Sequence, residues 1–400
     1  MASFKGITAD GQEVVYTDKK RHIWWFGWLG SIVVLGTIPL YFALEGNPLV
    51  TFIPMFYIYI FTAIVDKIMG VDEHNPPEEV VNEMAADNFY RWQVHSRIPV
   101  AIMILFAYIW FVGTQDLPWW SMIALIIGIG TSSGGVMMLT HELGHKSNKW
   151  DRLHAKIGNM IMGYGHFNIE HNRGHHVMVS TPEDPASSRM GENIYRFAIR
   201  ELTGTFKRGL YHEKRRLNAA GHSFWSWRND VLQVYAVTLT IMIGSVFLFG
   251  PQILWFLILH NVLGWYTLTQ ANYVEHYGLL REKLPNGKYE RTQPRHSWNT
   301  NHTFSNTLLF HLQRHSDHHA YPLRPYQVLR DFPNLPSLPS GYGGCFAMAA
   351  FPPLWFKVMN PKVMEWAGGD ITKVNIDPKK KDRLYAKWGG GDMGGLTPAE

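Results

Sequence analysis

Cysteine is nearly absent from this sequence, since Cys345 is the only one among 400 residues. A single thiol cannot form a disulfide framework within the chain. It also cannot supply the several thiolates of a cysteine-based zinc or iron–sulfur site. Any metal centre built by this chain must therefore use nitrogen or oxygen ligands.

Charged residues are scarce as well, at 17% of the chain, and few of them fall in the long apolar runs. A membrane-spanning helix needs about 20 mostly apolar residues. Six segments meet this requirement: residues 23–44, 48–69, 97–114, 117–140, 231–250 and 252–273. We therefore expect an all-α integral membrane protein with six transmembrane helices. The first twenty residues are polar, so the sequence shows no cleavable signal peptide.

The six segments pair into three hairpins with very short connections, at residues 45–47, 115–116 and 250–251. All long polar stretches therefore fall on one side of the membrane. Lys and Arg outnumber Asp and Glu in residues 141–230, which predicts that this side is cytoplasmic. Residues 70–96 are acidic, but acidic residues contribute little to orientation. The net charge of +5 then reflects this cytoplasmic excess and does not indicate nucleic-acid binding.

We divide the chain into three parts on this basis. Residues 1–22 form a cytoplasmic N-terminus. Residues 23–370 form the membrane bundle, with a cytoplasmic cap from residues 141–230 and 274–370. Residues 371–400 are rich in Lys and Gly and are expected to form a flexible tail or linker.

Histidine is the abundant residue, with 20 copies, and the most suggestive of them occur in four groups. Imidazole is the commonest metal ligand in proteins and suits iron, copper, zinc and nickel. The groups are His141 with His145, then His171 with His175 and His176, then His276, and finally His315 with His318 and His319.

The spacing within the groups has a physical reason. Residues three or four apart on a helix lie on one face, so their imidazoles can converge on one ion. The second and fourth groups each contain an additional, adjacent histidine. It lies on a neighbouring part of the helix surface and can reach a second ion. A structural zinc ion takes four ligands. Nine histidines therefore predict a site for two metal ions.

The remaining eleven histidines are expected to be surface, interfacial or supporting residues. They are His22, His74, His95, His154, His166, His212, His222, His260, His296, His302 and His311, of which the last two lie closest to the fourth group. Metal-bound histidines usually donate their other N–H to a carboxylate or carbonyl. The candidates for this supporting role are Glu142, Glu170, Glu275, Asp317 and the more distant Asp184.

Two functions from other chemical classes compete with this interpretation. Residues 141–145 also match the H-E-x-x-H helix of zinc metalloproteases, in which Glu142 would be the base. A protease does not need seven more histidines, so the surplus argues against it. A metal transporter would place ionisable residues near the middle of the membrane, and the predicted spans hold few.

The sequence around the histidines resembles the alkane 1-monooxygenase family of membrane di-iron hydroxylases, within the wider group of histidine-box fatty-acid desaturases and hydroxylases. Two stretches carry most of this resemblance, residues 272–278 (NYVEHYG) and residues 312–319 (LQRHSDHH). Residues 141–146 and 170–176 agree with it, and the likeness covers about residues 20–365. His276 distinguishes this family from enzymes with only eight histidines.

The resemblance implies a di-iron site that uses O₂ to hydroxylate the terminal methyl group of an n-alkane to a primary alcohol. It implies electrons from rubredoxin, supplied by an NAD(P)H-dependent rubredoxin reductase. Rubredoxin binds iron with four cysteines, so it must be a separate protein or be fused beyond residue 400. The implied location is the bacterial inner membrane, with the site and both termini cytoplasmic. A di-iron fatty-acyl desaturase or hydroxylase remains the alternative.

Two further sets of residues are expected to serve this function. An alkane dissolves in the bilayer, so it could enter an apolar channel between the helices. The channel candidates are Trp24, Trp25, Phe56, Tyr59, Leu139, Trp265 and Thr269. Rubredoxin docking needs positive charge, and the densest runs are Lys207-Arg208, Lys214-Arg215-Arg216 and Lys379-Lys380-Lys381. The same runs could contact anionic lipid headgroups.

Overall fold

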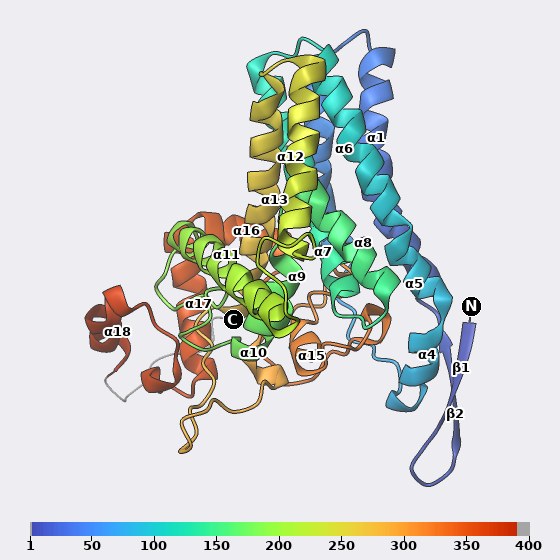
Figure 1. Cartoon of the computed structure of the whole chain (residues 1–400). Coiled ribbons are helices and arrows are strands. Elements are labelled where there is room, and N and C mark those ends of the chain that lie inside the picture. The colour runs from blue at the N-terminus through green and yellow to red at the C-terminus, as the bar shows by residue number, and fades with distance from the viewer. Residues whose placement is uncertain (1, 390–400) are drawn as a thin grey trace.

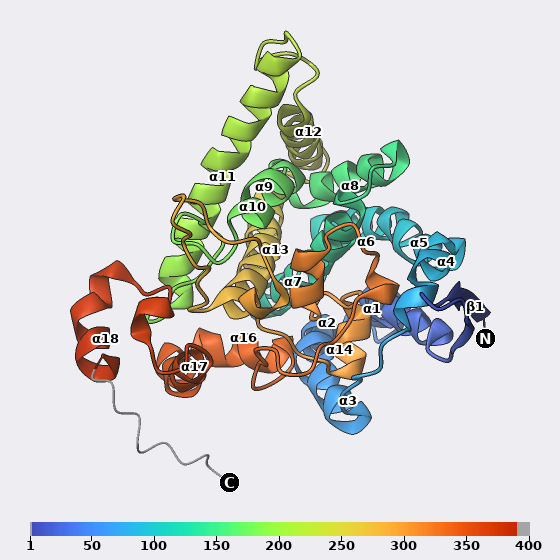
Figure 2. The same ribbon diagram turned by 90° about the horizontal axis from the view of Figure 1, so that it is seen from below.

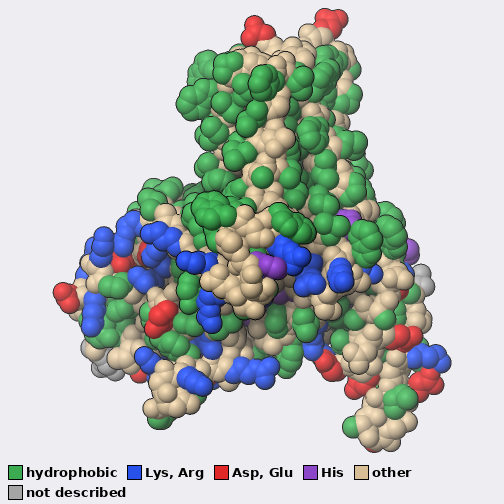
Figure 3. Space-filling view, in the orientation of Figure 1, with side chains coloured by type: hydrophobic (Ala, Val, Ile, Leu, Met, Phe, Trp, Pro, Cys, Tyr) green, Lys and Arg blue, Asp and Glu red, His purple; other side chains and the backbone are tan. Residues whose placement is uncertain are grey.

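A column of long helices rises from a wider base in the computed structural model, which describes residues 2–389 (Figure 1). The column contains α1 (Gly27–Ala43), α2 (Ile53–Phe56), α3 (Thr62–Met69), α6 (Arg97–Thr114), α7 (Trp119–Gly144), α12 (Asp230–Phe249) and α13 (Ile253–His276). Apolar side chains cover the column, whereas charged side chains gather on the base (Figure 3). The molecule therefore has an apolar part, the column, and a charged part, the base, arranged along one axis (Figure 3).

Five helical stretches are long and apolar enough to cross a membrane: Arg21–Ala43, Pro48–Met69, Asn88–Thr114, Trp119–Gly144 and Asp230–Phe249. They coincide with five of the six predicted segments. The sixth predicted segment forms α13, which stands beside α12 in the column but is not among the five. Its buried polar residues, among them His260, Asn261 and Gln270, lower its mean hydropathy.

Helix α7 is the central element of the column. It packs against α13 and against α8 (Lys149–Met162), and small residues allow close approach, since a Cβ on Gly134 would lie 2.5 Å from Cβ of Thr267. The helix continues past the predicted apolar segment, which ends at residue 140, as far as Gly144. Its last turn carries His141 down into the base.

Short helices in the base surround the lower ends of α7 and α13. They are α9 (Phe167–Glu170), the π-helical turn η5 (His171–His175), α10 (His176–Met178), α14 (Thr303–Leu308) and α15 (His315–Ala320). Seen from below, α11 (Ile194–Ala219) lies outside α9 and α10, and α16 (Tyr342–Ala350) and α17 (Pro352–Trp366) lie along the lower edge of the view, near the start of α11 (Figure 2). This ring of elements brings distant parts of the sequence together.

The N-terminal region departs from the all-α prediction. Strands β1 (Ala2–Ile7) and β2 (Glu13–Asp18) form an antiparallel hairpin in which Ala2 pairs with Asp18. The hairpin docks beside α4 (Val81–Ala86) and α5 (Asn88–His95), where the Tyr90 hydroxyl donates a hydrogen bond to Asp18. Burial of Phe4 against this surface holds the strands in place.

The predicted flexible tail also differs from the structure over residues 371–389. This stretch contains the short helical turns η8 (Ile371–Lys373) and η9 (Pro378–Lys380) and helix α18 (Lys381–Trp388). It is attached to α11, because Arg196 Nη1 lies 2.7 Å from Asp377 Oδ2 and Leu384 is buried. The rest of the predicted tail, residues 390–400, lies outside the described residues.

Candidate metal centre

The nine histidines named above converge into two groups. The first holds His141, His145, His171, His176 and His318, and the second holds His175, His276, His315 and His319. Within each group, one nitrogen from every histidine lies within 4.8 Å of all the others. Seven of the nine side chains are fully buried and two are partly buried.

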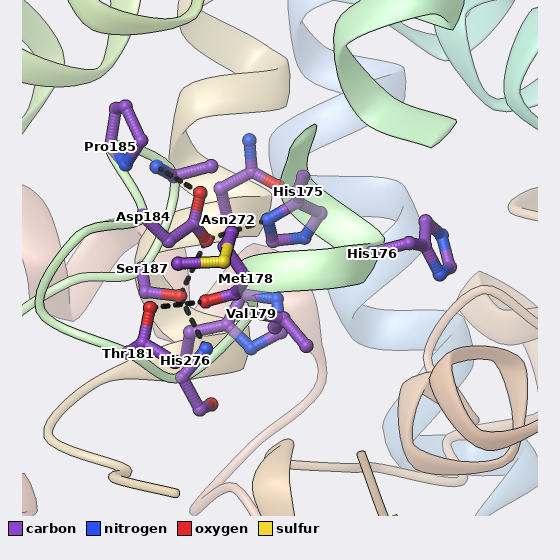
Figure 4. Close-up of polar contacts among 12 residues, drawn as sticks. His175, His176, Met178, Val179, Thr181, Asp184, Pro185, Ser187, Asn272 and His276 are labelled. Atoms are coloured by element: carbon purple, nitrogen blue, oxygen red, sulfur yellow. Dashed lines mark hydrogen bonds and ion pairs between the residues drawn. The ribbon is translucent and has the colours of Figure 1, made fainter. Parts of the chain in front are cut away.

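The π-helical turn η5 explains how one short segment serves both groups. A π-turn bonds residues five apart, and it places Nε2 of His176 3.0 Å from Nε2 of His171. His175 and His176 are neighbours in the sequence, yet their rings point in different directions (Figure 4). The expected i,i+4 pair of His171 and His175 is therefore replaced by the i,i+5 pair of His171 and His176.

Helix α15 divides its histidines in the same way. Nε2 of His319 lies 2.8 Å from Nε2 of His315, as expected for residues four apart on a helix. His318 faces the first group, with its Nε2 3.1 Å from Nε2 of His176. His276, at the end of α13, completes the second group, with its Nε2 3.2 Å from Nε2 of His315.

The chemistry of these nitrogens fits metal ions. Nε2 of His141, His145 and His175 is buried without a hydrogen-bond partner, a costly arrangement for a polar atom unless a ligand completes it. Burial lowers the pKa of His145 and His171 well below 6.5, so these rings are neutral and keep a free lone pair at neutral pH. Nine nitrogens in groups of five and four can hold two metal ions.

Asp184 lies against His175 from the outside. Nδ1 of His175 donates a hydrogen bond of 2.8 Å to Asp184 Oδ2, which also accepts 2.7 Å from the Ser187 hydroxyl (Figure 4). Arg208 donates 2.7 Å to the other oxygen. Burial favours the neutral acid, but His175 and Arg208 together lower the pKa of Asp184. The carboxylate therefore fixes the proton on Nδ1 and turns Nε2 toward the second group.

Glu275 contacts the second group directly. Its Oε2 lies 3.2 Å from Nε2 of His315, the same nitrogen that faces His276. Tyr342 on α16 donates a hydrogen bond to the other oxygen, Oε1. Both side chains are almost completely buried. A carboxylate oxygen that could bind a metal ion therefore lies at the edge of the four-histidine group.

The other three predicted carboxylates have partners other than the nine histidines. Glu142 is paired with Lys146 at 2.7 Å, and Glu170 accepts a hydrogen bond of 2.6 Å from Nε of Arg208. Asp317 accepts 3.0 Å from the backbone N–H of Arg330. These three stabilise the elements that carry the histidines, and within the described residues none of them forms a hydrogen bond or ion pair with an imidazole.

Sequence reasoning missed Arg208 and Tyr342 as parts of this site. Arg208 was expected to face a partner, but it bridges Glu170 and Asp184 inside the base. Tyr342 follows the last histidine group by more than twenty residues and reaches Glu275 only in the fold. Neither residue stands next to a histidine in the sequence, so no local signal could have identified it.

The eleven remaining histidines are absent from both groups within the described residues, as was expected. His302 and His311, which precede the fourth group in the sequence, have other partners. Nδ1 of His302 lies 2.7 Å from the Thr300 hydroxyl, and Nδ1 of His311 lies 3.1 Å from the Tyr326 carbonyl oxygen.

An apolar cavity of about 220 Å³ lies between α1, α3, α6, α7 and α16. Of the predicted channel residues, Tyr59 and Leu139 line it. Trp25 and Phe56 are exposed on the outside instead. The others pack elsewhere: Trp24 against Tyr326, Trp265 on the Met162 carbonyl, and Thr269 on Glu201.

Comparison with known proteins agrees with this geometry. The family described as "Fatty acid desaturase" matches residues 117–343, which carry all nine histidines. The chain is 45% identical over 380 residues to alkane 1-monooxygenase of Ectopseudomonas oleovorans, covering 95% of this chain and 94% of the relative. This chain belongs to the alkane 1-monooxygenase family.

Other relatives place this alkane 1-monooxygenase family member in a wider set. It is 44% identical over 382 residues to alkane 1-monooxygenase 1 of Alcanivorax borkumensis, covering 95% of this chain and 94% of that protein. It is 29% identical over 232 residues to the xylene/toluene monooxygenase hydroxylase component of Pseudomonas putida, covering 57% of this chain and 60% of the relative. The likeness therefore extends to a monooxygenase component with a different named substrate.

Proposed function

We propose that this protein is a membrane-bound di-iron monooxygenase that hydroxylates the terminal methyl group of n-alkanes to primary alcohols. The observation that carries this proposal is the pair of buried histidine groups near an apolar cavity, since α7 lines the cavity at Leu139 and carries His141. The names of relatives that align over nearly the whole chain support the substrate class. The reaction inserts one atom of O₂ into a C–H bond and releases the other as water, consuming two electrons and two protons.

In this proposal the nine histidines hold two iron ions, which when bound supply the activation of O₂ that no side chain provides. The rest of the work belongs to the protein. Asp184 orients His175 through Nδ1, and Glu275 places a carboxylate oxygen beside Nε2 of His315 at the four-histidine group. The mainly apolar cavity is the proposed site of the alkane, which can make only apolar contacts there.

The proposed topology has six transmembrane helices, with α13 as the sixth, and a cytoplasmic base that carries both termini and the site. Basic side chains gather on the base just below the apolar column (Figure 3). Acidic side chains lie at the end of the column farthest from the base (Figure 3). This distribution supports the positive-inside orientation in a bacterial inner membrane. Residues 23–370 then form one bundle with its cap.

The proposed electron donor is rubredoxin, supplied by an NAD(P)H-dependent reductase. Arg208 and Arg216 form internal ion pairs, so the docking candidates narrow to Lys207, the Lys214-Arg215 pair and the Lys379–Lys381 run. Charge reversal at Lys214 and Arg215 should raise the KM for rubredoxin while the iron content stays unchanged. An unchanged KM would assign this pair to lipid headgroups or solvent.

Metal analysis and a product assay test the whole proposal. Purified protein should contain about two irons per chain and should convert octane to 1-octanol when given rubredoxin, its reductase and NADH. Zinc without iron, or an olefinic acyl product from a fatty-acyl substrate, would instead support the protease or desaturase alternative. Replacement of His276 by Ala should reduce both iron content and turnover, and unchanged values would exclude His276 as a ligand.

A further inference from the structure

The wall of the apolar cavity contains one charged side chain, Arg97, with which an alkane can form no hydrogen bond or ion pair. Arg97 lines the cavity, is only 5% exposed, and forms no ion pair with an acidic residue in the described part of the chain. Its Nη2 donates a hydrogen bond of 2.7 Å to the Trp24 carbonyl, but its Nε is buried without a partner. Its charge lies 4.5 Å from the centre of the Phe310 ring.

A second unsatisfied donor lies in the same wall. Tyr57 is 7% exposed, and its hydroxyl is buried without a hydrogen-bond partner. Two glycines one turn apart on α1 make room for both groups. A Cβ on Gly27 would collide with the Arg97 guanidinium, and a Cβ on Gly30 would lie 3.5 Å from the Tyr57 hydroxyl.

The local backbone supports this arrangement. Tyr57 begins a π-helical turn, η3 (Tyr57–Phe61), and such turns are frequent at functional sites. Phe310 and the following His311 adopt left-handed backbone conformations, with φ of 52° and 53°. Conformations of this kind cost free energy and persist where the surroundings impose them. They present the Phe310 ring to the guanidinium.

An unpaired cation and an unpaired hydroxyl in an apolar cavity are expensive. An alkane has no acceptor atom and cannot satisfy either. We propose that Arg97 and Tyr57 bind the carboxylate of a fatty acid whose alkyl chain occupies the cavity. Oxidation of a primary alcohol by dehydrogenases elsewhere yields such an acid. Competition between acid and alkane rests on the proposed function, whereas binding of the acid does not.

Equilibrium binding to the purified full-length protein tests the site without any turnover. The probes are dodecanoate and methyl dodecanoate, which share a chain and differ in charge. The wild-type protein should bind dodecanoate about tenfold more tightly or better, because hydrogen bonds to a charged group are strong. Equal affinities for acid and ester would overturn the proposal.

Variants assign this preference to the two residues. Arg97→Met should reduce it to about threefold or less, and Tyr57→Phe should weaken dodecanoate binding by roughly threefold to tenfold. Arg228→Met, which removes an exposed arginine beside Trp227, is the matched control and should change nothing. Retention of the full preference in a folded Arg97→Met protein would overturn the proposal. If that variant does not fold, Arg97→Lys should keep part of the preference for dodecanoate over its methyl ester. A preference that is unchanged or completely lost in Arg97→Lys would contradict the proposal.

A further arm distinguishes the headgroup. Dodecyl phosphate presents another anion on the same chain, and a lipid phosphate would share its chemistry. Weaker binding of dodecyl phosphate than of dodecanoate supports the carboxylate assignment. Tighter binding of the phosphate would overturn that assignment in favour of a phosphate site. Whether dodecanoate inhibits octane turnover is a separate test, which concerns only the competition between the acid and the alkane for the cavity.

Discussion

At the scale of single residues, Asp184 has the most direct influence on the candidate centre. It has no exposed surface and joins His175, Ser187 and Arg208 through its two oxygens. These contacts hold the carboxylate ionised and keep the Nδ1 proton of His175 in place. A neutral amide at this position would weaken both effects.

Asp184→Asn should therefore lower metal affinity and turnover by about tenfold to a hundredfold, as is usual for partners of metal-bound histidines. Metal content under limiting iron and the activity of the purified protein would measure this. Asp317→Asn is the matched control, because Asp317 is equally buried but contacts Arg324 and Arg330 and no histidine. Equal loss in both variants would contradict a specific role for Asp184.

Glu201 is a second buried carboxyl whose ionisation matters. It lies on α11 and accepts hydrogen bonds from Thr269 at 2.6 Å and Asn272 at 3.1 Å on α13. Burial raises its pKa from 4.5 to about 7. Between these two pH values the folded protein binds a proton that the unfolded chain does not. The free energy of unfolding therefore falls as pH rises through this window.

Glu201→Gln should remove this pH dependence, because an amide carries no titrating proton and still accepts a hydrogen bond from Thr269. The gain in stability of the variant over wild type should grow from pH 5 to pH 8, by roughly 3 kcal/mol at most. Melting temperatures in detergent across this range would measure it. Glu282→Gln, at an exposed site, should give a constant difference. A constant difference for Glu201→Gln would contradict the assignment.

At the scale of elements, the π-turn η5 shows where sequence reasoning stopped. The four histidine groups were visible in the sequence because ligand spacing is local. Their division between the two sites was not, because helical spacing pairs His171 with His175, whereas the π-turn pairs His171 with His176. The extra residue in this turn has no sequence signature, and the turn packs against α11, which is far away in the sequence.

Gly174 makes that packing possible. A Cβ at this position would collide with Nε of Arg208 and lie 2.8 Å from Oε1 of Glu170. Gly174→Ala should displace Arg208 from Glu170 and Asp184 and lower metal content and turnover by tenfold or more, on the order of the loss expected without Asp184. Gly244→Ala on α12, where no atom lies within 4 Å, is the control and should keep both. Normal metal content in Gly174→Ala would show that α11 tolerates the added methyl group.

The helices themselves were easier to predict than their surroundings. Apolar length located five spans, four of them to within four residues at both ends, because a helix in lipid must be long and apolar. The N-terminal hairpin was missed because residues 1–22 lack a long apolar signal and their pairing depends on docking against α4 and α5. The tail was predicted from composition, which cannot report that Asp377 meets Arg196.

At the scale of the whole molecule, the apolar column and the charged base imply one orientation in the membrane. Asn286 lies exposed in a loop of the base, and Glu45 is exposed at the opposite end of the column, after α1. The positive-inside tendency assigns them to opposite sides of the bilayer.

Cysteines introduced at these two positions test that orientation. In intact cells, a membrane-impermeant maleimide should label Glu45→Cys and leave Asn286→Cys unlabelled. In inverted vesicles the pattern should be reversed, and mass spectrometry or gel shift would measure it. Labelling of Asn286→Cys from outside would contradict a cytoplasmic base, and labelling of both from one side would contradict the number of spans.

The native cysteine makes such experiments simple. Cys345 is completely buried in α16, its thiol donates to the Ser340 carbonyl oxygen, and burial raises its pKa to about 12. It therefore has almost no thiolate to react with maleimides or oxidants at neutral pH. The wild-type chain is its own labelling background, so pairs of spin labels or fluorophores can report distances across the column and base without first removing a native thiol.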